Sequence, residues 1–118
     1  MCMRSYEKLI AWQEAFQLCL RTYEVTRTFP SDERFSLTNQ MRRASTSVCM
    51  NIAEGSGKKS KKDTSHFLDI ALGSLEELHC QYRISLGLSY INQQRFNEAD
   101  EHIHRVGYLL HKLQESLS

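Results

Sequence analysis

The fold is decided by residues 92–117, which read NQQRFNEADEHIHRVGYLLHKLQESL. Apolar residues recur in this stretch with alternating spacings of three and four, which places them on one face of an α-helix. Asn92 stands just before the pattern, where an asparagine side chain can cap the first turn. The stretch therefore predicts an amphipathic helix with one inward face. The residues of that face are Phe96, Ala99, Ile103, Val106, Leu110, Leu113 and Leu117.

Three upstream segments show the same periodicity, and each has a recognisable end. Pro30 stops the first segment, because proline disfavours helix in the residue before it. Gly55 suits the C-terminal cap of the second, and Ser60 begins a capping box for the third. Four helices with short connections predict an all-α, up-down-up-down four-helix bundle that fills the chain as one domain. The predicted helices are residues 5–28, residues 32 or 38 to 54, residues 60–90 and residues 92–117, within a single domain of residues 1–118.

Composition agrees with this fold class and excludes several others. The 118 residues (13.8 kDa) include one proline and five glycines, too few turn residues for an all-β domain. Hydrophobic residues make up 41% of the chain and charged residues 25%, which excludes a disordered or low-complexity protein. No apolar run is long enough to span a membrane. The four cysteines form no CxxC motif and no signal-peptide pattern precedes them, so we expect a cytoplasmic protein with reduced thiols.

Charge is balanced overall but unevenly distributed. The net charge is +1, yet residues 1–62 carry 11 Lys/Arg and 6 Asp/Glu, whereas residues 63–118 carry 4 and 8. The basic half can bind an anion or pair with the acidic half of another copy, or the chain simply has a mixed solvated surface. Lysines in the turn at residues 58–62 suit phosphate contacts without base specificity, and no aromatic residue interleaves with them for base stacking. The candidate nucleic-acid-binding residues are Arg42, Arg43, Lys58, Lys59, Lys61 and Lys62.

The first predicted helix carries two apolar stripes, and the third has an unusually wide apolar face. A helix in a monomeric bundle needs one stripe, so the excess favours a homo-oligomer over scattered surface hydrophobes. The predicted core stripe of the first helix is Leu9, Trp12, Phe16, Cys19, Tyr23 and Thr26, and the candidate oligomer-interface residues are Ala11, Leu18, Val25, Leu68, Leu72 and Leu86.

Two Glu-x-x-His sequences have the spacing found in di-iron four-helix bundles. They pair Glu76 with His79 and Glu101 with His104. At 100° per residue, Glu76, Glu101 and His104 point away from the core stripes of their helices. Outward-facing ligands cannot build a metal site inside the bundle, so we expect no metal and no cofactor.

A second constellation pairs Arg95 with His102, seven residues apart on one flank of the last helix. Four-helix ribonucleases of the HEPN class use such a pair, with histidine as general acid/base and arginine on the phosphate. The alternative is that both residues solvate the edge of the bundle, because short motifs often arise by chance. No catalytic triad signature or phosphate-binding loop accompanies them, so we predict a protein without enzymatic activity and keep the ribonuclease as the alternative.

Four short sequence segments, here called the family strings, occur together and in the same order as in a known family. With these strings, which extend over nearly the whole chain, the sequence resembles the bacterial four-helix-bundle family named for proteins encoded in intervening sequences of the 23S rRNA gene, also labelled S23 ribosomal protein. The strings are YEKLIAWQ at residues 6–13, FPSDERFSLTNQMRRA at residues 29–44, SVCMNIAEG at residues 47–55 and FLDIALGSLEEL at residues 67–78.

The resemblance implies a ring-like homopentamer of four-helix protomers. It also implies kinship with the accessory variability proteins of diversity-generating retroelements, basic pentamers that bind a reverse transcriptase and its RNA template. We therefore predict a homopentameric accessory or assembly protein associated with RNA, a reverse transcriptase, or both. A purely structural ring that binds another protein is a further alternative to the ribonuclease.

The family strings also contain polar and glycine residues for which we expect structural roles. Gln40 and Asn51 flank a core stripe, where they can hydrogen-bond across helices or meet a neighbouring protomer. Glu54 lies near a helix C-terminus and needs a basic partner, such as Arg42, Arg43 or a neighbour's arginine. Glycine and serine in the middle of a helix suggest close helix packing. The full set is Gln40, Asn51, Glu54, Gly55, Gly73 and Ser74.

Overall fold

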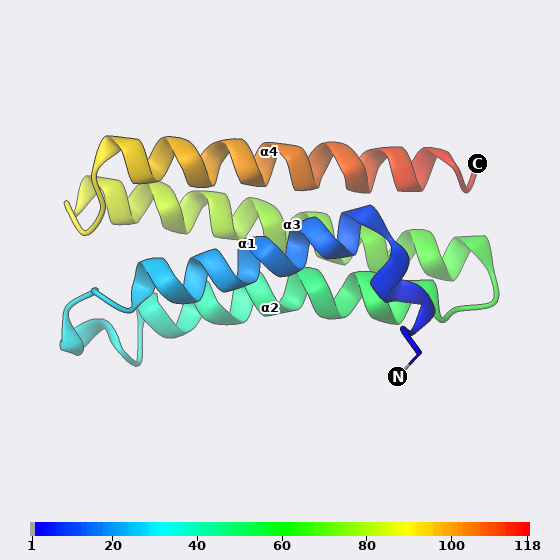
Figure 1. Cartoon of the computed structure of the whole chain (residues 1–118), viewed down its shortest axis with the longest axis horizontal. Helices are drawn as coiled ribbons and strands as arrows, with labels where there is room; N and C mark the ends of the chain where they lie inside the picture. Colours follow the sequence, from blue (N-terminus) through cyan, green and yellow to red (C-terminus); the bar gives the residue numbers. More distant parts are fainter. Residues whose placement is uncertain (1) are drawn as a thin grey trace.

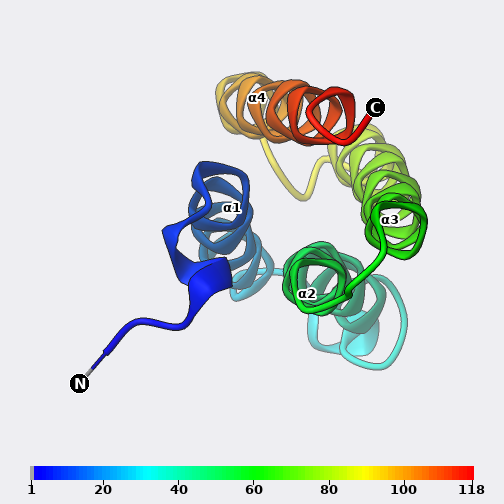
Figure 2. The ribbon, with the colours of Figure 1, turned by 90° about the vertical axis from the view of Figure 1, so that its right-hand side faces the viewer.

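The predicted up-down-up-down four-helix bundle is confirmed by a computed structural model, which describes residues 2–118 (Figure 1). Each helix packs against the next along the chain and the last packs against the first, so the four helices surround one core (Figure 2). The bundle measures 43 × 28 × 22 Å. None of the helices within residues 2–118 is long and apolar enough to cross a membrane. The elements are η1 (Ser5–Lys8), α1 (Ile10–Thr26), η2 (Ser31–Glu33), α2 (Leu37–Ser56), α3 (Lys61–Gly87) and α4 (Gln93–Glu115), where η marks a 3₁₀ turn.

Local hydrogen bonds explain where the helices begin and end. The predicted N-caps of α3 and α4 are confirmed, because Ser60 Oγ accepts from the Asp63 amide at 3.0 Å and Asn92 Oδ1 accepts from the Arg95 amide at 2.8 Å. α3 ends three residues earlier than predicted. Ser89 has φ 63°, a left-handed conformation that cannot continue a helix.

3₁₀ turns occupy the earliest predicted starts of the first two helices, so both helices begin later than those starts. η1 occupies the start of the predicted first helix and contacts both α1 and α2, so α1 begins only at Ile10. η2 follows Pro30 and separates the end of α1 from α2, which begins at Leu37. The later of the two predicted starts of the second helix is therefore correct to within one residue.

The inward face predicted for α4 is confirmed from Phe96 to Leu110, whereas Leu113 and Leu117 are partly buried against the core. The stripe that the sequence predicts for α2 is buried throughout, and the predicted centre of the α3 face is buried except at the half-buried Phe67. Those predicted residues are Leu37, Met41, Ala44, Val48 and Ile52 on α2 and Phe67, Ala71, Leu75, Leu78 and Tyr82 on α3. A polar contact also crosses this core, where Thr22 Oγ1 and the Tyr82 hydroxyl lie 2.9 Å apart. Burial raises the pKa of Tyr82 to about 12, although the bond to Thr22 opposes the shift. Buried core residues from these three helices are Leu37, Met41, Ala44, Val48, Ile52, Leu68, Ala71, Leu75, Leu78, Tyr82, Phe96, Ala99, Ile103, Val106 and Leu110.

The predicted inward face of α1 is correct only in part. Cys19 and Thr26 are buried as predicted, and Leu9 and Trp12 pack against the core, but the second stripe, with Ala11, Leu18 and Val25, also faces the core. Leu18 is 1% exposed, whereas Phe16 and Tyr23 of the predicted stripe are 39% and 38% exposed. The buried face is made of small or medium side chains, which let α1 approach its neighbours closely. Large aromatic side chains fit better at the solvent edge, where Trp12 stacks on Phe16 with ring centroids 5.0 Å apart. The inward face of α1 comprises Ala11, Ala15, Leu18, Cys19, Thr22, Val25 and Thr26.

The same burial corrects the predicted oligomer interface. Four of its six residues lie in the core of the single protomer, so they are not free to contact another copy. The other two, Leu72 and Leu86, are partly buried and pack against this core. The contradicted residues are Ala11, Leu18, Val25 and Leu68.

Gly55 and Gly73 do not have the roles predicted for them. Gly55 is not the C-cap of α2, since the helix continues to Ser56 and Gly57 caps it. Instead, a Cβ added at Gly55 would lie 3.0 Å from the Cβ of Phe67 and 3.3 Å from the carbonyl oxygen of Thr64, so this glycine lets α2 approach α3. Gly73 was expected at a close helix contact, but a Cβ added there would have no atom of another described helix within 4 Å.

Candidate functional site

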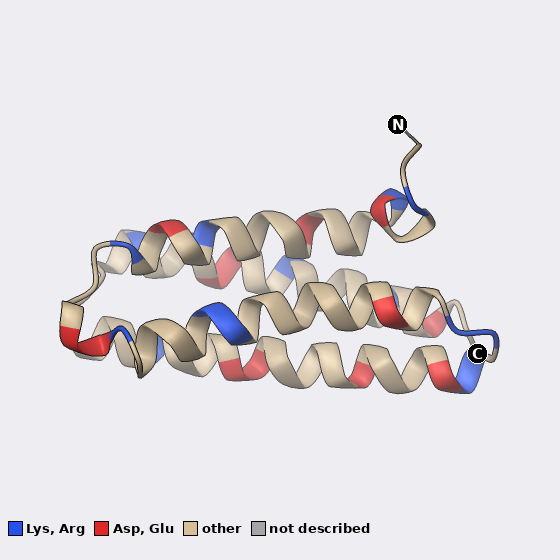
Figure 3. Ribbon diagram, turned by 90° about the horizontal axis from the view of Figure 1, so that it is seen from below, with Lys and Arg blue, Asp and Glu red and all other residues tan. Residues whose placement is uncertain are grey.

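Four lysines gather on the α2–α3 turn at one end of the bundle (Figure 3). Lys58 and Lys59 lie in the turn itself, and Lys61 and Lys62 begin α3. All four side chains are exposed, and within residues 2–118 no carboxylate lies within the 4.0 Å of an ion pair from any of them. The Nζ of Lys58 lies 5.1 Å from the ring centroid of Phe67. The turn therefore presents several cations to solvent without an intramolecular counter-ion.

Other basic residues lie at the same end because the helices are antiparallel. The N-terminal segment, the α2–α3 turn and the C-terminus of α4 all lie at the right-hand end of Figure 1. This places Arg4 and Lys8, from η1 and the residue before it, at the end that holds the lysine turn. Lys112 of α4 also lies there, but its Nζ is 3.7 Å from the Glu115 carboxylate.

Arg42 and Arg43 do not join the lysine turn. They lie near the start of α2, roughly 24 Å along the helix from Lys58 at 1.5 Å per residue. Arg42 is half-buried and connects α2 to α1, since its Nε donates to Thr26 Oγ1 at 3.0 Å and its guanidinium lies 4.7 Å from the Tyr23 ring centroid. The contacts of Arg42 are structural. Arg43 is exposed and lines a separate shallow groove between α2 and α3.

The polar residues of the family strings link α2 to α3 only in part. Ser47 Oγ and Ser74 Oγ lie 2.8 Å apart across the two helices. Asn51 supports this contact from within α2, where its Nδ2 donates to the carbonyl oxygen of Ser47 at 2.8 Å. Gln40 and Glu54 are exposed, and in the described part of the chain no basic side chain pairs with Glu54. The predicted hydrogen bond across helices therefore belongs to the serine pair.

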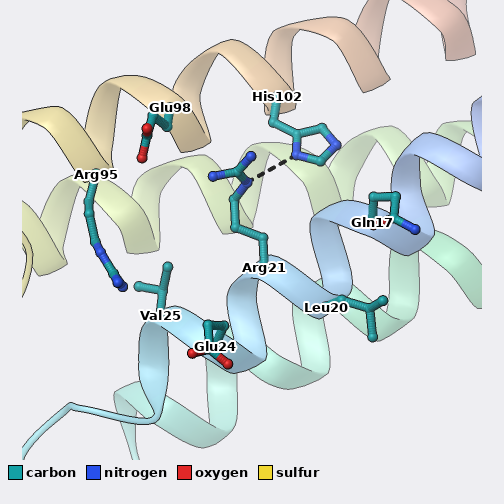
Figure 4. A pocket seen from close by; sticks show the side chains of 8 residues that line it. All are labelled: Gln17, Leu20, Arg21, Glu24, Val25, Arg95, Glu98 and His102. Atoms are coloured by element: carbon teal, nitrogen blue, oxygen red, sulfur yellow. Dashed lines mark hydrogen bonds between the residues drawn. The ribbon is translucent and has the colours of Figure 1, made fainter.

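The structure brings Arg95 and His102 to one groove between α1 and α4, with a volume of about 480 Å³ (Figure 4). Arg21 enters the groove from α1 and donates from Nε to Nδ1 of His102 at 3.2 Å. The Arg95 side chain runs toward Val25, away from His102 (Figure 4). The groove is lined by Gln17, Leu20, Arg21, Glu24, Val25, Arg95, Glu98 and His102.

Both imidazole nitrogens of His102 are engaged inside the protein. Because Nδ1 accepts from Arg21, the ring proton is on Nε2, which lies 3.1 Å from the carbonyl oxygen of Glu14 and 3.4 Å from its carboxylate. Arg105 Nε lies 3.4 Å from the same carboxylate. This network joins α1 to α4. Of its members, only His102 was a candidate from the sequence, because Glu14 and Arg21 are more than 80 positions away.

Burial, followed by the nearby Arg21 cation, lowers the pKa of His102 from its ordinary value of 6.5. The imidazole is therefore neutral at neutral pH, and its only ring proton is used by Glu14. A general acid/base must reach a substrate proton through a free nitrogen. These contacts favour a structural role for His102 at the α1–α4 interface.

The lowered pKa predicts a dependence of stability on pH. The unfolded chain binds a proton to His102 more readily than the folded chain, so the stabilisation is complete above pH 6.5 and is lost as pH falls through the folded-state pKa. Urea unfolding at pH about 7.5 and about 5.5 should show a smaller loss of stability on acidification for His102→Gln than for the native protein. His111→Gln, which changes an exposed histidine on the same helix, should keep the native loss. Equal losses for all three proteins would contradict the assignment.

Comparison with known proteins supports the fold and the family. The chain is similar to a crystal structure of a protein of unknown function from the S23 ribosomal protein family of Bacteroides thetaiotaomicron, with a TM-score of 0.83 and 19% sequence identity. The similarity covers 90% of this chain and 96% of that chain. None of the curated proteins matches the sequence. The model of the 23S rRNA-intervening sequence protein family matches residues 7–112, and this chain therefore belongs to that family.

Proposed function

We propose that this protein is a non-catalytic homopentameric accessory protein that associates with RNA through the lysine turn. The observation that carries the proposal is the cluster of Lys58, Lys59, Lys61 and Lys62, exposed and without counter-ions in the described chain. Ammonium groups of this kind bind phosphates as point charges and do not select bases.

The position of Lys61 and Lys62 also favours an anionic ligand. Both lie in the first turn of α3, where the helix dipole is positive and favours acidic side chains. Lysines there repel the dipole and each other, so they cost helix stability instead of adding to it. An anionic ligand at this end would relieve the repulsion, and a phosphate backbone provides several anions in a row.

A ring of protomers would present the lysine turn several times. Multivalent contact raises affinity for a long polyanion without any new type of contact, which offsets the low net charge of the single chain. The outer face of α1 supports an assembly of this kind, because Phe16, Leu20 and Tyr23 leave 39%, 48% and 38% of their surfaces exposed. A reverse transcriptase or another protein is the alternative ligand of the ring.

Labelled single-stranded RNA is the probe that tests this function. We expect its affinity to fall steeply with salt, and changing the four lysines to glutamine should reduce the magnitude of the log–log slope by about 0.7 for each phosphate that the variant no longer neutralises. Light scattering on the same samples should give about five times the protomer mass of 13.8 kDa. Fluorescence anisotropy over a salt series measures the affinity.

A matched variant removes equal charge elsewhere. Glutamine at the exposed Arg27, Arg34, Arg83 and Arg95 lowers the net charge by the same amount while keeping the lysine turn. This variant should retain most of the affinity and the native salt slope. The RNA contact would be refuted by salt-independent binding, by no binding, or by equal losses of RNA affinity in both variants. A protein that co-purifies after RNase treatment would favour a ring that binds another protein.

A further inference from the structure

The α1–α2 interface contains two cysteines that its register brings face to face. Arg42 Nε donates to Thr26 Oγ1 at 3.0 Å, which fixes how the antiparallel helices are aligned. Moving seven residues, or about two turns, back along α1 and forward along α2 leads from this contact to Cys19 and Cys49. Positions seven apart lie nearly on the same face of a helix, so the two cysteines should meet as Thr26 and Arg42 do.

Contacts around Cys19 agree with this register. Ser45 Oγ, one turn before Cys49 on α2, lies 3.6 Å from Cys19 Sγ. Cys19 is 8% exposed and Cys49 is half-buried against the core. Small side chains are also buried on both helices, including Ala15 on α1 (1% exposed) and Ala44 on α2 (3% exposed). Such side chains permit the close backbone approach that a disulfide requires.

The two thiols also influence each other's ionisation. The Cys49 thiol is the main cause that lowers the pKa of Cys19 to about 6; burial opposes this shift and the Ser45 hydroxyl adds to it. The hydrogen bond with Cys19, followed by burial, raises the pKa of Cys49. The pair therefore loses its first proton more readily than its second, and the remaining S–H stabilises the thiolate. A thiolate is the form of cysteine that reacts with oxidants.

We propose that Cys19 and Cys49 form a redox modification site, at which a peroxide converts a partly buried dithiol into an intrachain disulfide between α1 and α2. The Cys19 thiolate attacks one oxygen of hydrogen peroxide, the O–O bond breaks, and the sulfur becomes a sulfenic acid. The released hydroxide takes up the proton that Cys19 had lost and becomes water. The Cys49 sulfur then attacks the sulfenic sulfur, the S–O bond breaks, and the hydroxyl leaves as water with the Cys49 proton. The two thiols are oxidised and one peroxide is reduced to two waters.

The disulfide would close a loop that contains the whole α1–α2 connection, including η2 and Phe35, which is 87% exposed. It would link α1 to α2 without moving either helix far, because the helices are already in contact. The site is independent of the proposed RNA contact, since no residue of the lysine turn takes part in it.

Mass spectrometry of a full-length Cys2→Ser/Cys80→Ser protein tests the proposal, because these changes remove the two exposed thiols and keep Cys19 and Cys49. The folded protein is treated with hydrogen peroxide, then denatured and alkylated with N-ethylmaleimide. The expected monomer is lighter by two hydrogens and carries no alkyl group, and its digest contains the Cys19 peptide joined to the Cys49 peptide. Reduction before alkylation should restore two alkylation sites.

Two single variants on the same background serve as controls. Cys19→Ser and Cys49→Ser each leave one thiol, so neither should lose two hydrogens, and each should gain either one alkyl group or added oxygen. Circular dichroism confirms that every variant is folded before oxidation. Three results for the peroxide-treated protein with both cysteines would overturn the proposal. They are oxygen addition without a cross-link, alkylation of both cysteines, and a disulfide that joins two chains.

Discussion

Replacing Leu18 by alanine should lower the free energy of unfolding by about 2–5 kcal/mol. Leu18 is 1% exposed on the inward face of α1, and removing its side chain leaves a cavity that the surrounding core cannot fully close. Leu20, two residues further along the same helix, is 48% exposed, so Leu20→Ala should change the free energy by about 0.5 kcal/mol or less. Urea denaturation followed by circular dichroism measures both values.

This pair of variants tests which stripe of α1 faces the core. Equal effects, or a larger effect at Leu20, would contradict the observed orientation of the helix. The measurement should be repeated over a range of protein concentrations, because a residue at an interface between copies changes stability in a concentration-dependent way. If the loss of unfolding free energy depends on protein concentration in Leu20→Ala but is constant in Leu18→Ala, then Leu20 lies on an outer face that contacts other copies and Leu18 lies in the protomer core.

Gly55→Ala should lower the free energy of unfolding by about 1–3 kcal/mol. The new methyl group would lie 3.0 Å from the Cβ of Phe67 and 3.3 Å from the carbonyl oxygen of Thr64, so α2 and α3 must separate slightly. Separation also weakens the bond at 2.9 Å from Thr64 Oγ1 to the carbonyl oxygen of Gly55. Thermal unfolding detects the loss as a lower Tm.

Gly73→Ala is the matched control, and it should have the opposite sign. Gly73 lies in the middle of α3 with open space around the added methyl group, so alanine should stabilise the helix by about 0.4–1 kcal/mol. A lower Tm for both variants would show that Gly73 also has a close neighbour, as a contact between copies would provide. A higher Tm for both would show that α2 and α3 can move apart at little cost.

The sequence predicted the inward faces of α2 and α4 correctly because each carries one dominant apolar stripe. In α4 the heptad repeat is compatible with only one orientation of the helix about its axis, the one that buries Ile103 and Val106. α1 has apolar side chains on several sides, so the sequence does not determine which side faces the core. The prediction placed large residues such as Phe16 inward, whereas close packing of α1 against its neighbours favours small and medium side chains there.

Candidate site residues were predictable where they are adjacent in sequence. The four lysines of the turn lie within five consecutive residues, interrupted only by Ser60, and an exposed turn between two helices presents their side chains together. Arg42 and Arg43 were grouped with it on charge alone, but a straight helix separates them from Lys58. The link from Arg21 to His102 and the meeting of Cys19 with Cys49 depend on helix register, which a periodic pattern leaves free to slide.

By itself the sequence determined four amphipathic helices, most of their ends and the family, because apolar periodicity, capping residues and the family's sequence strings are local properties of the chain. Only the tertiary structure decided which face of α1 is buried, why Gly55 lacks a side chain, and which polar groups and thiols meet between helices. Those features depend on the volume and position of side chains distant in sequence, which become neighbours only when the helices pack around one core.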